Sequence, residues 1–425
     1  MPASPSTARA INDRLALRLL QQEGPLTAGQ LKKLTGLSRP SVADLVERLA
    51  EAGLIGVVGE SGEQRRGPNA RLYGIVAHRA HLAALDVRTE GVSVVVADLL
   101  GAVLAEASVP ITDETDTAPA VERAVALVER TAKEAGVERL HTVGVGAPGL
   151  IDPATGELRD STGLPEWHRR LAAALQERFQ ARVVVENETN LAALAEQRDG
   201  AARDRDTFVL LWLGHGIGAA VVLDGVLRRG ASGGTGEIGF LPVPGTGGMP
   251  SATGCEGGFH SLAGAAAIAE LARPYGVVAS AVEHEPHAAA LVREAVFRVA
   301  SGSAPVPHTA GVVDVAAGGG GGPRSSPRPF GGAASEFLDA LADRVALGAA
   351  SVIAVLDPGC VVLSGEIGRA GGEVLAARVR ERLGRMTPLP TEVRAGTLGG
   401  GAVLRGALLM ARDGAQDELF APPER

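Results

Sequence analysis

The sequence predicts an α/β protein made of a helical N-terminal module with a β hairpin, followed by two α/β lobes. Within the first 80 residues, two short helical patterns joined at a glycine precede two β segments. An apolar pattern near residue 82 recurs near residue 208, and each copy is followed by a helical stretch and a glycine-rich β run, which indicates a duplication. The expected domains are therefore 1–80 and 81–425, with the two lobes split near residue 200.

Two short helices joined by a tight turn are predicted in the N-terminal module. Thr27 and Gln30 form a Thr-x-x-Gln capping box that starts the first helix, and Gly36 ends it. Ser38 is a good N-cap for the second helix, and Pro40 falls in its first turn. The apolar positions of the second helix should form one buried stripe against the first helix. This stripe is Val42, Leu45, Val46 and Leu49 against Leu31 and Leu34, with Arg39, Ser41, Asp44 and Arg48 outside.

The segments around these two helices favour a DNA-binding module over an ordinary helical hairpin. A helical pattern over 8–22 precedes them and is the expected place for dimer contacts, and β segments at 54–58 and 64–73 flank a polar tip to form a wing. A helix in the major groove and a basic wing on the phosphates form a known docking geometry on double-stranded DNA. The residues expected to bind operator DNA are Ser38, Arg39, Pro40, Ser41, Asp44, Arg48, Arg65 and Arg66.

Charge and composition agree with this interpretation. The formal net charge is −8, yet residues 1–80 hold 11 Lys and Arg against 7 Asp and Glu, so the module is basic and the remainder acidic. Two cysteines exclude a disulfide framework and suit a reducing cytoplasm. The sequence shows neither a secretory signal nor a long uncharged apolar run, so we expect a cytoplasmic protein that does not enter a membrane.

The rest of the chain completes the two lobes. Glycine-rich β runs at 142–149 and 360–366 end in loops that are expected to line a small-molecule cleft. Residues 301–334 are rich in Pro, Gly and Ser and are interpreted as a disordered surface insertion. Helices at 334–356 and 402–410 are expected to finish the second lobe.

Four motifs, in this order along the chain, resemble the ROK family of repressors, open reading frames and sugar kinases, in its regulator form. The resemblance covers nearly the whole chain. It implies an actin-like, duplicated ribonuclease-H-type fold of sugar-kinase lobes, a sugar site between the lobes, and a homodimer or homotetramer. The motifs are Gly-Val-Gly-Ala-Pro-Gly-Leu-Ile-Asp at 144–152, Glu-Asn-Glu-Thr-Asn at 186–190, Gly-His-Gly-Ile-Gly at 214–218 and Gly-Ala-Ser-Gly-Gly-Thr-Gly-Glu-Ile-Gly at 230–239.

Departures from the family pattern argue against kinase activity. Where the family kinases carry the phosphate loop Asp-x-Gly-Gly-Thr, residues 86–90 read Asp-Val-Arg-Thr-Glu, so both glycines are lost and Glu90 would repel phosphate. We interpret Asp86 as a residual turn-forming acid at a strand end. Glu188 occupies the position of the kinase catalytic Asp, where its longer side chain would misplace a base but could still accept a sugar hydroxyl.

The resemblance also implies a structural zinc site, but its ligand positions are lost. Phe240 replaces the histidine, and the cysteine run aligns with residues that are not zinc ligands, so no metal or other cofactor is expected. Cys255 alone cannot make a tetrahedral site, and His284 with His287 is interpreted as a solvated helix face. The aligned positions are Ser251, Thr253, Gly254, Gly257 and Gly258.

The family's sugar contacts carry over to a partly altered set of residues. Asn187 and Glu237 match the family, although Asn187 could only cap a helix and Glu237 could only brace a glycine turn. Phe240 and His260 differ from it and could change which sugar fits. The expected ligand-binding residues are Gly149, Asn187, Glu188, Glu237, Phe240 and His260.

These sequence features are compatible with three functions. The leading hypothesis is a DNA-binding regulator, expected to be a repressor of carbohydrate metabolism genes, that senses a sugar or sugar derivative with a catalytically inactive kinase-like domain. The first alternative is a ROK-type sugar kinase that phosphorylates a hexose with ATP and carries a DNA-binding extension. The second is a regulator whose sugar pocket has closed and which responds to a partner protein.

Overall fold

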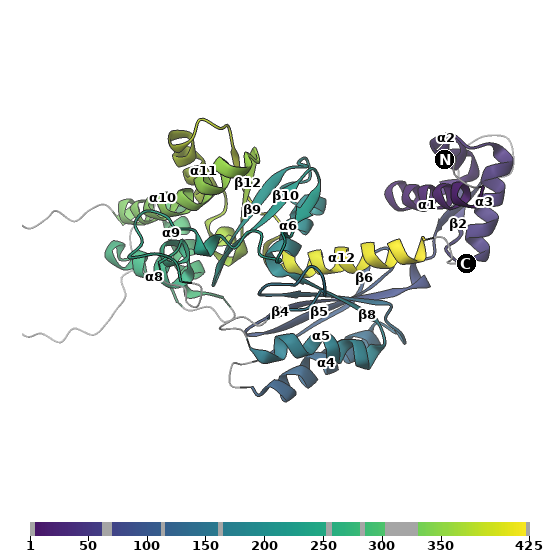
Figure 1. Ribbon diagram of the computed structural model, residues 1–425, viewed down its shortest axis with the longest axis horizontal. Coiled ribbons are helices and arrows are strands. Elements are labelled where there is room, and N and C mark those ends of the chain that lie inside the picture. Colours follow the sequence, from purple (N-terminus) through teal and green to yellow (C-terminus); the bar gives the residue numbers. More distant parts are fainter. Residues whose placement is uncertain are drawn as a thin grey trace, which may run out of the picture. The chain divides into compact units, whose positions relative to one another are not determined.

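The structure is a computed structural model in which the chain forms two compact units. One unit comprises Met1–Leu191 with Val403–Arg425, and the other comprises Ala192–Ala402 (Figure 1). Arg65 and Arg66, together with most of the predicted insertion at 301–334, lie outside the described residues. Those described are 5–61, 70–111, 115–159, 165–251, 257–280, 285–301 and 330–421.

The N-terminal module is a winged helix-turn-helix, as predicted. Its strands form a sheet in the order β1-β3-β2, and β2 and β3 pair antiparallel as the two sides of the wing. The helix predicted over 8–22 is present as α1, with Leu17 and Leu20 buried and Ile11 exposed. The elements are α1 (Pro5–Glu23), β1 (Leu26–Thr27), α2 (Ala28–Thr35), α3 (Arg39–Glu51), β2 (Ile55–Ser61) and β3 (Ala70–Ile75).

The predicted caps determine where α2 and α3 begin and end. The Thr27 N–H donates to Gln30 Oε1 at 2.8 Å, and the Gln30 N–H donates to Thr27 Oγ1 at 3.2 Å, which completes the capping box. Gly36 ends α2 in the left-handed conformation, at φ 71°. Ser38 Oγ accepts a hydrogen bond from the Ser41 N–H at 3.3 Å and starts α3.

The apolar stripe of α3 is buried as predicted, but one of its expected partners is not. Leu31 of α2 is 1% exposed, whereas Leu34 is 47% exposed, so the expectation that Leu34 packs into the stripe was wrong. A helix of eight residues makes only about two turns, and Leu31 alone fills the contact while Leu34 lies in the last turn. The buried stripe residues are Val42, Leu45, Val46 and Leu49.

The first lobe is a five-stranded sheet in the order β6-β5-β4-β7-β8. The strands β4, β5 and β6 pair antiparallel, and β7 and β8 extend the sheet in parallel with β4. Helices α4 and α5 cover one face and α12 lies along the other (Figure 1). The elements are η1 (Ala77–Arg79), β4 (His81–Arg88), β5 (Gly91–Asp98), β6 (Val103–Pro110), α4 (Thr117–Glu134), β7 (Thr142–Ala147), α5 (Glu166–Phe179), β8 (Arg182–Asn187) and α12 (Ala402–Leu419).

The last helix packs on the first lobe, which corrects the expectation that it finishes the second. Two glycines of β7 make room for α12, because a Cβ at Gly144 would lie 2.4 Å from Ala407 O and one at Gly146 would lie 2.7 Å from a methyl carbon of Val403. Gln416 Nε2 also donates to Leu99 O at 2.9 Å. No local pattern in α12 indicates which sheet it covers, because these partners are remote in sequence.

The second lobe repeats the first. Its strand order, β11-β10-β9-β12-β13, matches the first sheet position by position, with the same mixture of antiparallel and parallel pairs. Asp98 ends β5 and Asp224 directly follows β10, so the two aspartates hold equivalent places, as the repeated pattern predicted. The strands are β9 (Phe208–Leu213), β10 (Ile217–Leu223), β11 (Val226–Arg228), β12 (Cys360–Ser364) and β13 (Glu392–Ala395).

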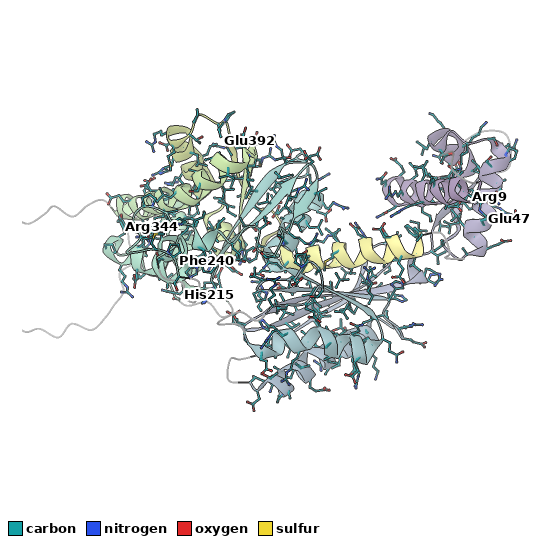
Figure 2. All side chains as sticks on the ribbon, in the orientation of Figure 1. Arg9, Glu47, His215, Phe240, Arg344 and Glu392 are labelled. Carbon is teal, nitrogen blue, oxygen red and sulfur yellow. The ribbon has the colours of Figure 1, made fainter. Side chains whose placement is uncertain are left out.

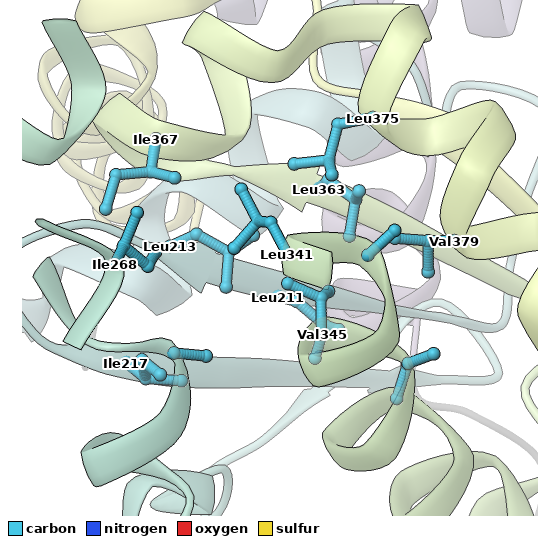
Figure 3. Packing of buried hydrophobic residues seen from close by; sticks show 14 of the residues in the cluster. Leu211, Leu213, Ile217, Ile268, Leu341, Val345, Leu363, Ile367, Leu375 and Val379 are labelled. Atoms are coloured by element: carbon cyan, nitrogen blue, oxygen red, sulfur yellow. The ribbon is translucent and has the colours of Figure 1, made fainter. Parts of the chain in front are cut away.

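Helices bury one face of the second sheet. Leu211 and Leu363 of adjacent strands pack with Leu341 and Val345 of α10 and with Leu375 of α11 (Figure 3). Within the described part of the chain, no helix is long and apolar enough to span a membrane. The helices are α6 (Glu188–Asp199), which begins in the first unit, η2 (Ile238–Phe240), α7 (His260–Ala263), α8 (Ala265–Ala272), η3 (Arg273–Tyr275), α9 (His287–Ser301), α10 (Phe330–Leu356), α11 (Gly365–Met386) and η4 (Gly399–Gly401).

Candidate DNA-binding surface and ligand-binding residues

The start of α3 presents a polar, exposed surface. Arg39, Pro40 and Ser41 are exposed in its first turn, and Asp44 follows one turn later on the outside of the helix. Ser38 Oγ, which caps the helix, also lies 2.8 Å from Ser41 Oγ, so the two hydroxyls form a hydrogen bond with each other. The side chain of Arg39 makes no ion pair with any residue in the described ranges, and it is therefore available to an external anion.

Arg48 is less exposed than expected, because its side chain is engaged by two carboxylates. Its side chain is 29% exposed, and its Nη2 donates to Asp13 Oδ1 of α1 at 2.6 Å. Its Nη1 is bonded to Asp44, one turn earlier on α3. The guanidinium therefore joins α3 to α1, and these two carboxylates compete with any DNA phosphate for it.

Three further basic residues are exposed near the predicted DNA-binding residues. Lys32 and Lys33 are exposed in the last turn of α2, directly before the turn into α3, and Arg71 is exposed on the wing strand β3. These three residues could have been selected from the sequence, because Lys32 and Lys33 lie close to Gly36 and Arg71 lies in the predicted wing. The predicted wing contacts Arg65 and Arg66 lie outside the described residues.

In the first lobe, Asn187 joins two of the other expected ligand-binding residues. It ends β8, and its Nδ2 donates both to Gly149 O and to Glu188 Oε2, each at 3.0 Å. Its Oδ1 accepts the Thr189 N–H at 2.8 Å and so caps α6. Asn187 thus has the capping role that the sequence left open as an alternative, and it also holds Gly149 and Glu188 together.

The other three expected ligand-binding residues lie near one another in the second lobe. Glu237 precedes η2, Phe240 ends it at 46% exposure, and His260 starts α7. The Phe240 N–H donates to Glu237 O at 3.3 Å, and a Cβ on Gly239 would lie 3.6 Å from His260 Cβ. Figure 2 labels Phe240 and His215 among the side chains of this lobe.

The surroundings of this cluster shift its protonation equilibria. Nearby protein atoms partly desolvate the Glu237 carboxyl and raise its pKa above the ordinary value, although the residue remains accessible to solvent. Burial lowers the pKa of His260, and the nearby His215 imidazole lowers it further. At neutral pH, His260 is therefore expected to be neutral and able both to donate and to accept a hydrogen bond.

An ion pair forms within the segment that aligns with the family's phosphate loop. Asp86 is 6% exposed inside β4, and Arg88 Nε and Nη2 both lie 3.0 Å from its Oδ2. The interpretation of Asp86 as a turn-forming acid was therefore wrong, because the turn comes later, between Arg88 and Gly91. The guanidinium of Arg88 stands at a position where the kinase loop has a glycine.

The positions that align with the family's zinc site are only partly described by the structure. Phe240, Ser251, Gly257 and Gly258 are described, whereas Thr253, Gly254, Cys255 and His284 lie outside the described residues. Over the described ranges, no three His, Cys, Asp or Glu side chains come close enough together to hold a metal ion.

Comparison with known proteins agrees with the two-part architecture. Residues 82–320 match the ROK family, and residues 11–67 match the MarR family. The DNA-binding transcriptional dual regulator NagC of Escherichia coli K12 is 28% identical over 243 residues, which cover 55% of this chain and 58% of that protein. The xylose repressor of Caldicellulosiruptor bescii is 24% identical over 237 residues, covering 55% and 59% respectively. The alignments thus span less than two thirds of these two regulators.

Kinases are related as well. The glucokinase of Thermotoga maritima is 32% identical over 242 residues, covering 57% of this chain and 68% of that protein. Among solved structures, a ROK family transcriptional regulator described as a homolog of the E. coli MLC protein has a TM-score of 0.72 at 20% identity, covering 97% of this chain and 98% of that chain. A Streptomyces griseus glucokinase solved with glucose and AMPPNP has a TM-score of 0.59 at 22% identity, covering 79% and 100%. Both structures share the fold.

The family match covers more than half of the chain, and the two repeated sheets and the fold neighbours agree with it. The protein therefore belongs to the ROK family and carries a MarR-type winged helix in front of its ROK domain.

Proposed function

We propose that this protein is a transcriptional regulator, acting as a repressor of carbohydrate metabolism genes. The observation that carries the proposal is α3, which presents exposed Arg39 and Ser41 from a first turn capped by Ser38, in front of a ROK domain. Similarity to NagC and to xylose repressors supports the same function. A homodimer would place two copies of α3 on half-sites about one helical turn apart, or a multiple of it, so the operator should be roughly palindromic.

The ROK domain of this regulator senses a sugar or sugar derivative. Gly149 and Glu188 offer a carbonyl and a carboxylate to sugar hydroxyls, and Asn187, which donates one amide hydrogen to each of them, holds the two acceptors together. Within the second unit, Glu237, Phe240 and His260 present a carboxylate, an exposed ring and an imidazole as candidate sugar contacts of their own. The effector changes DNA affinity only to the extent that it binds one conformation of the protein more tightly than the other.

The domain is proposed to be catalytically inactive. Arg88 paired with Asp86 leaves a guanidinium and no glycines at the phosphate-loop position. The similarity to a glucokinase keeps the sugar kinase as the second candidate. Hexose-dependent ATP turnover that disappears in the Glu188→Ala variant would establish the kinase.

The deciding experiment is fluorescence anisotropy of the full-length protein with DNA from upstream of its own gene. Random duplex serves as competitor, and the salt concentration is fixed because non-specific binding is mainly electrostatic. We expect binding that survives the competitor, weakens in Arg39→Ala and changes when an effector sugar is added. Affinity equal to that for random duplex, on this DNA and on a genomic fragment library, would reject the regulator.

A further inference from the structure

A cavity of about 680 Å³ lies at the edge of the first-lobe sheet where the parallel strands begin. Its wall includes His81, Arg182 and His141. His81 is the first residue of β4, Arg182 is the first residue of β8, and His141 directly precedes β7. Asn187 and Gly149 belong to the opposite ends of these strands, so the cavity is separate from the proposed effector contacts. Its volume falls in the range of about 300–1,000 Å³ that is typical of small-molecule sites.

Backbone hydrogen bonds hold the three strand starts side by side. The His141 N–H donates to His81 O at 2.8 Å, and the Arg182 N–H donates to His141 O at 3.1 Å. Arg79 reaches the cavity from η1, Arg139 from the loop before β7, and Glu418 from the end of α12. Side chains from segments far apart in sequence therefore converge on a rigid edge.

The cavity contains more cations than its own carboxylates can neutralise. Three arginines line it, against the two carboxylates of Glu138 and Glu418, and the imidazoles of His81 and His141 complete its polar wall. Arg79 and Arg139 make no ion pair with any residue in the described ranges. Glu418 is only loosely engaged, at 3.8 Å from Arg182 Nη1 and 3.9 Å from His141 Nε2, both longer than a hydrogen bond.

We propose that this cavity binds a hydroxylated phosphate monoester. The guanidinium groups of Arg79, Arg139 and Arg182 match phosphate oxygens in charge and geometry. Glu138 and Glu418 are acceptors for the hydroxyls of the same ligand, and the volume exceeds what a phosphate ion needs. Because Arg79 belongs to η1, which leads from the wing strand β3 to β4, the bound ligand would join this connection to the base of the sheet.

Isothermal titration calorimetry of the full-length protein tests the site with inorganic phosphate, ribose 5-phosphate and neutral ribose at constant ionic strength. We expect one saturable ribose 5-phosphate site per chain, at least 10-fold weaker binding of inorganic phosphate, and no binding of ribose. Arg139→Glu and Arg182→Gln should each weaken binding at least 10-fold. Arg380→Glu, which changes an exposed arginine of α11, should leave it unchanged.

Four results would overturn the proposal. The first is the absence of saturable binding of ribose 5-phosphate, and the second is wild-type affinity for it in folded Arg139→Glu and Arg182→Gln. The third is equal affinity for inorganic phosphate and ribose 5-phosphate, and the fourth is loss of ribose 5-phosphate binding in Asn187→Ala. The last result would place the ligand at the proposed effector residues instead. Circular dichroism of each variant shows whether it is folded, and the conservative Arg182→Gln change keeps the test valid if charge reversal at Arg139 unfolds the lobe.

Discussion

Two arginines of α3 differ in what they can contact. Arg39 has no carboxylate partner among the described residues, whereas Arg48 bridges Asp13 and Asp44. Arg39→Ala should therefore weaken operator binding by about 1–3 kcal/mol without changing the melting temperature. Arg48→Ala should instead lower the free energy of unfolding by about 1 kcal/mol, because it breaks an interhelical pair. Fluorescence anisotropy measures the operator affinity of both variants, and thermal melts measure their stability. A loss of stability in Arg39→Ala with a loss of operator affinity only in Arg48→Ala would contradict the prediction.

Asn187 combines a cap and an amide donor, and two substitutions separate these roles. Serine caps a helix about as well as asparagine but has no amide to donate to Gly149 and Glu188. Asn187→Ser should keep the unfolding free energy within about 0.5 kcal/mol of wild type, and Asn187→Ala should lower it by about 1 kcal/mol. Both should lose the operator response to sugar. An intact response in Asn187→Ser would show that the residue is only a cap.

Glu237 gives the second lobe a predictable pH dependence. Its carboxyl has a raised pKa in the folded state because of desolvation, so its contribution to stability is greatest below the unfolded value of 4.5 and is lost as the pH rises through the folded value. Glu237→Gln should match wild-type stability at low pH and exceed it at neutral pH. Urea unfolding of both proteins across this range measures the difference. A difference that is independent of pH would contradict the assignment.

At the scale of elements, the contact between β7 and α12 depends on glycine. A methyl group at Gly144 would lie 2.4 Å from Ala407 O and 3.2 Å from Ala411 Cβ, so Gly144→Ala should destabilise the protein by about 1–3 kcal/mol. Gly384→Ala on α11 is the control, because no atom lies near its added methyl group, and it should stabilise by about 0.5–1 kcal/mol. Urea denaturation measures both changes. Equal stability of the two variants would refute tight packing at Gly144.

The elements that were predictable from sequence are those with local causes. The limits of α2 and α3 follow from Thr27, Gly36 and Ser38, whose effects reach only three or four residues along the chain. The duplication was visible because the same buried strands recur in the same order. The placement of α12 was not predictable, since it depends on two glycines that precede it by more than 250 residues.

The candidate site was predictable only in part. Family resemblance placed Asn187 and Glu237, but it gave neither the bond to Gly149 nor the shift in the Glu237 pKa, which depend on packing. The pair of Asp86 and Arg88 could have been found, because residues two apart on a strand point to the same face. The cavity beside Arg139 could not, because it combines segments joined only by the fold.

At the scale of the whole molecule, the chain leaves the first unit after residue 191 and returns to it at residue 403. A chain that ends at Ala402 lacks nearly all of α12, so one face of the first sheet loses its cover. Hydrogen exchange at β4 and β7 should then accelerate at least 10-fold, while β9 and β12 keep their protection. A chain that ends at Ala421 is the control. Unchanged protection of β7 in the shorter chain would show that α12 is dispensable.

The late return of α12 also affects how the protein is made. The first-lobe strands leave the ribosome early, yet the helix that covers them comes last, after the whole second lobe. At roughly 5–20 residues per second, synthesis of the intervening chain takes on the order of 10 to 40 s. For that time the nascent chain carries an apolar sheet face without its cover, which is the kind of surface that chaperones bind and that aggregates when they are scarce.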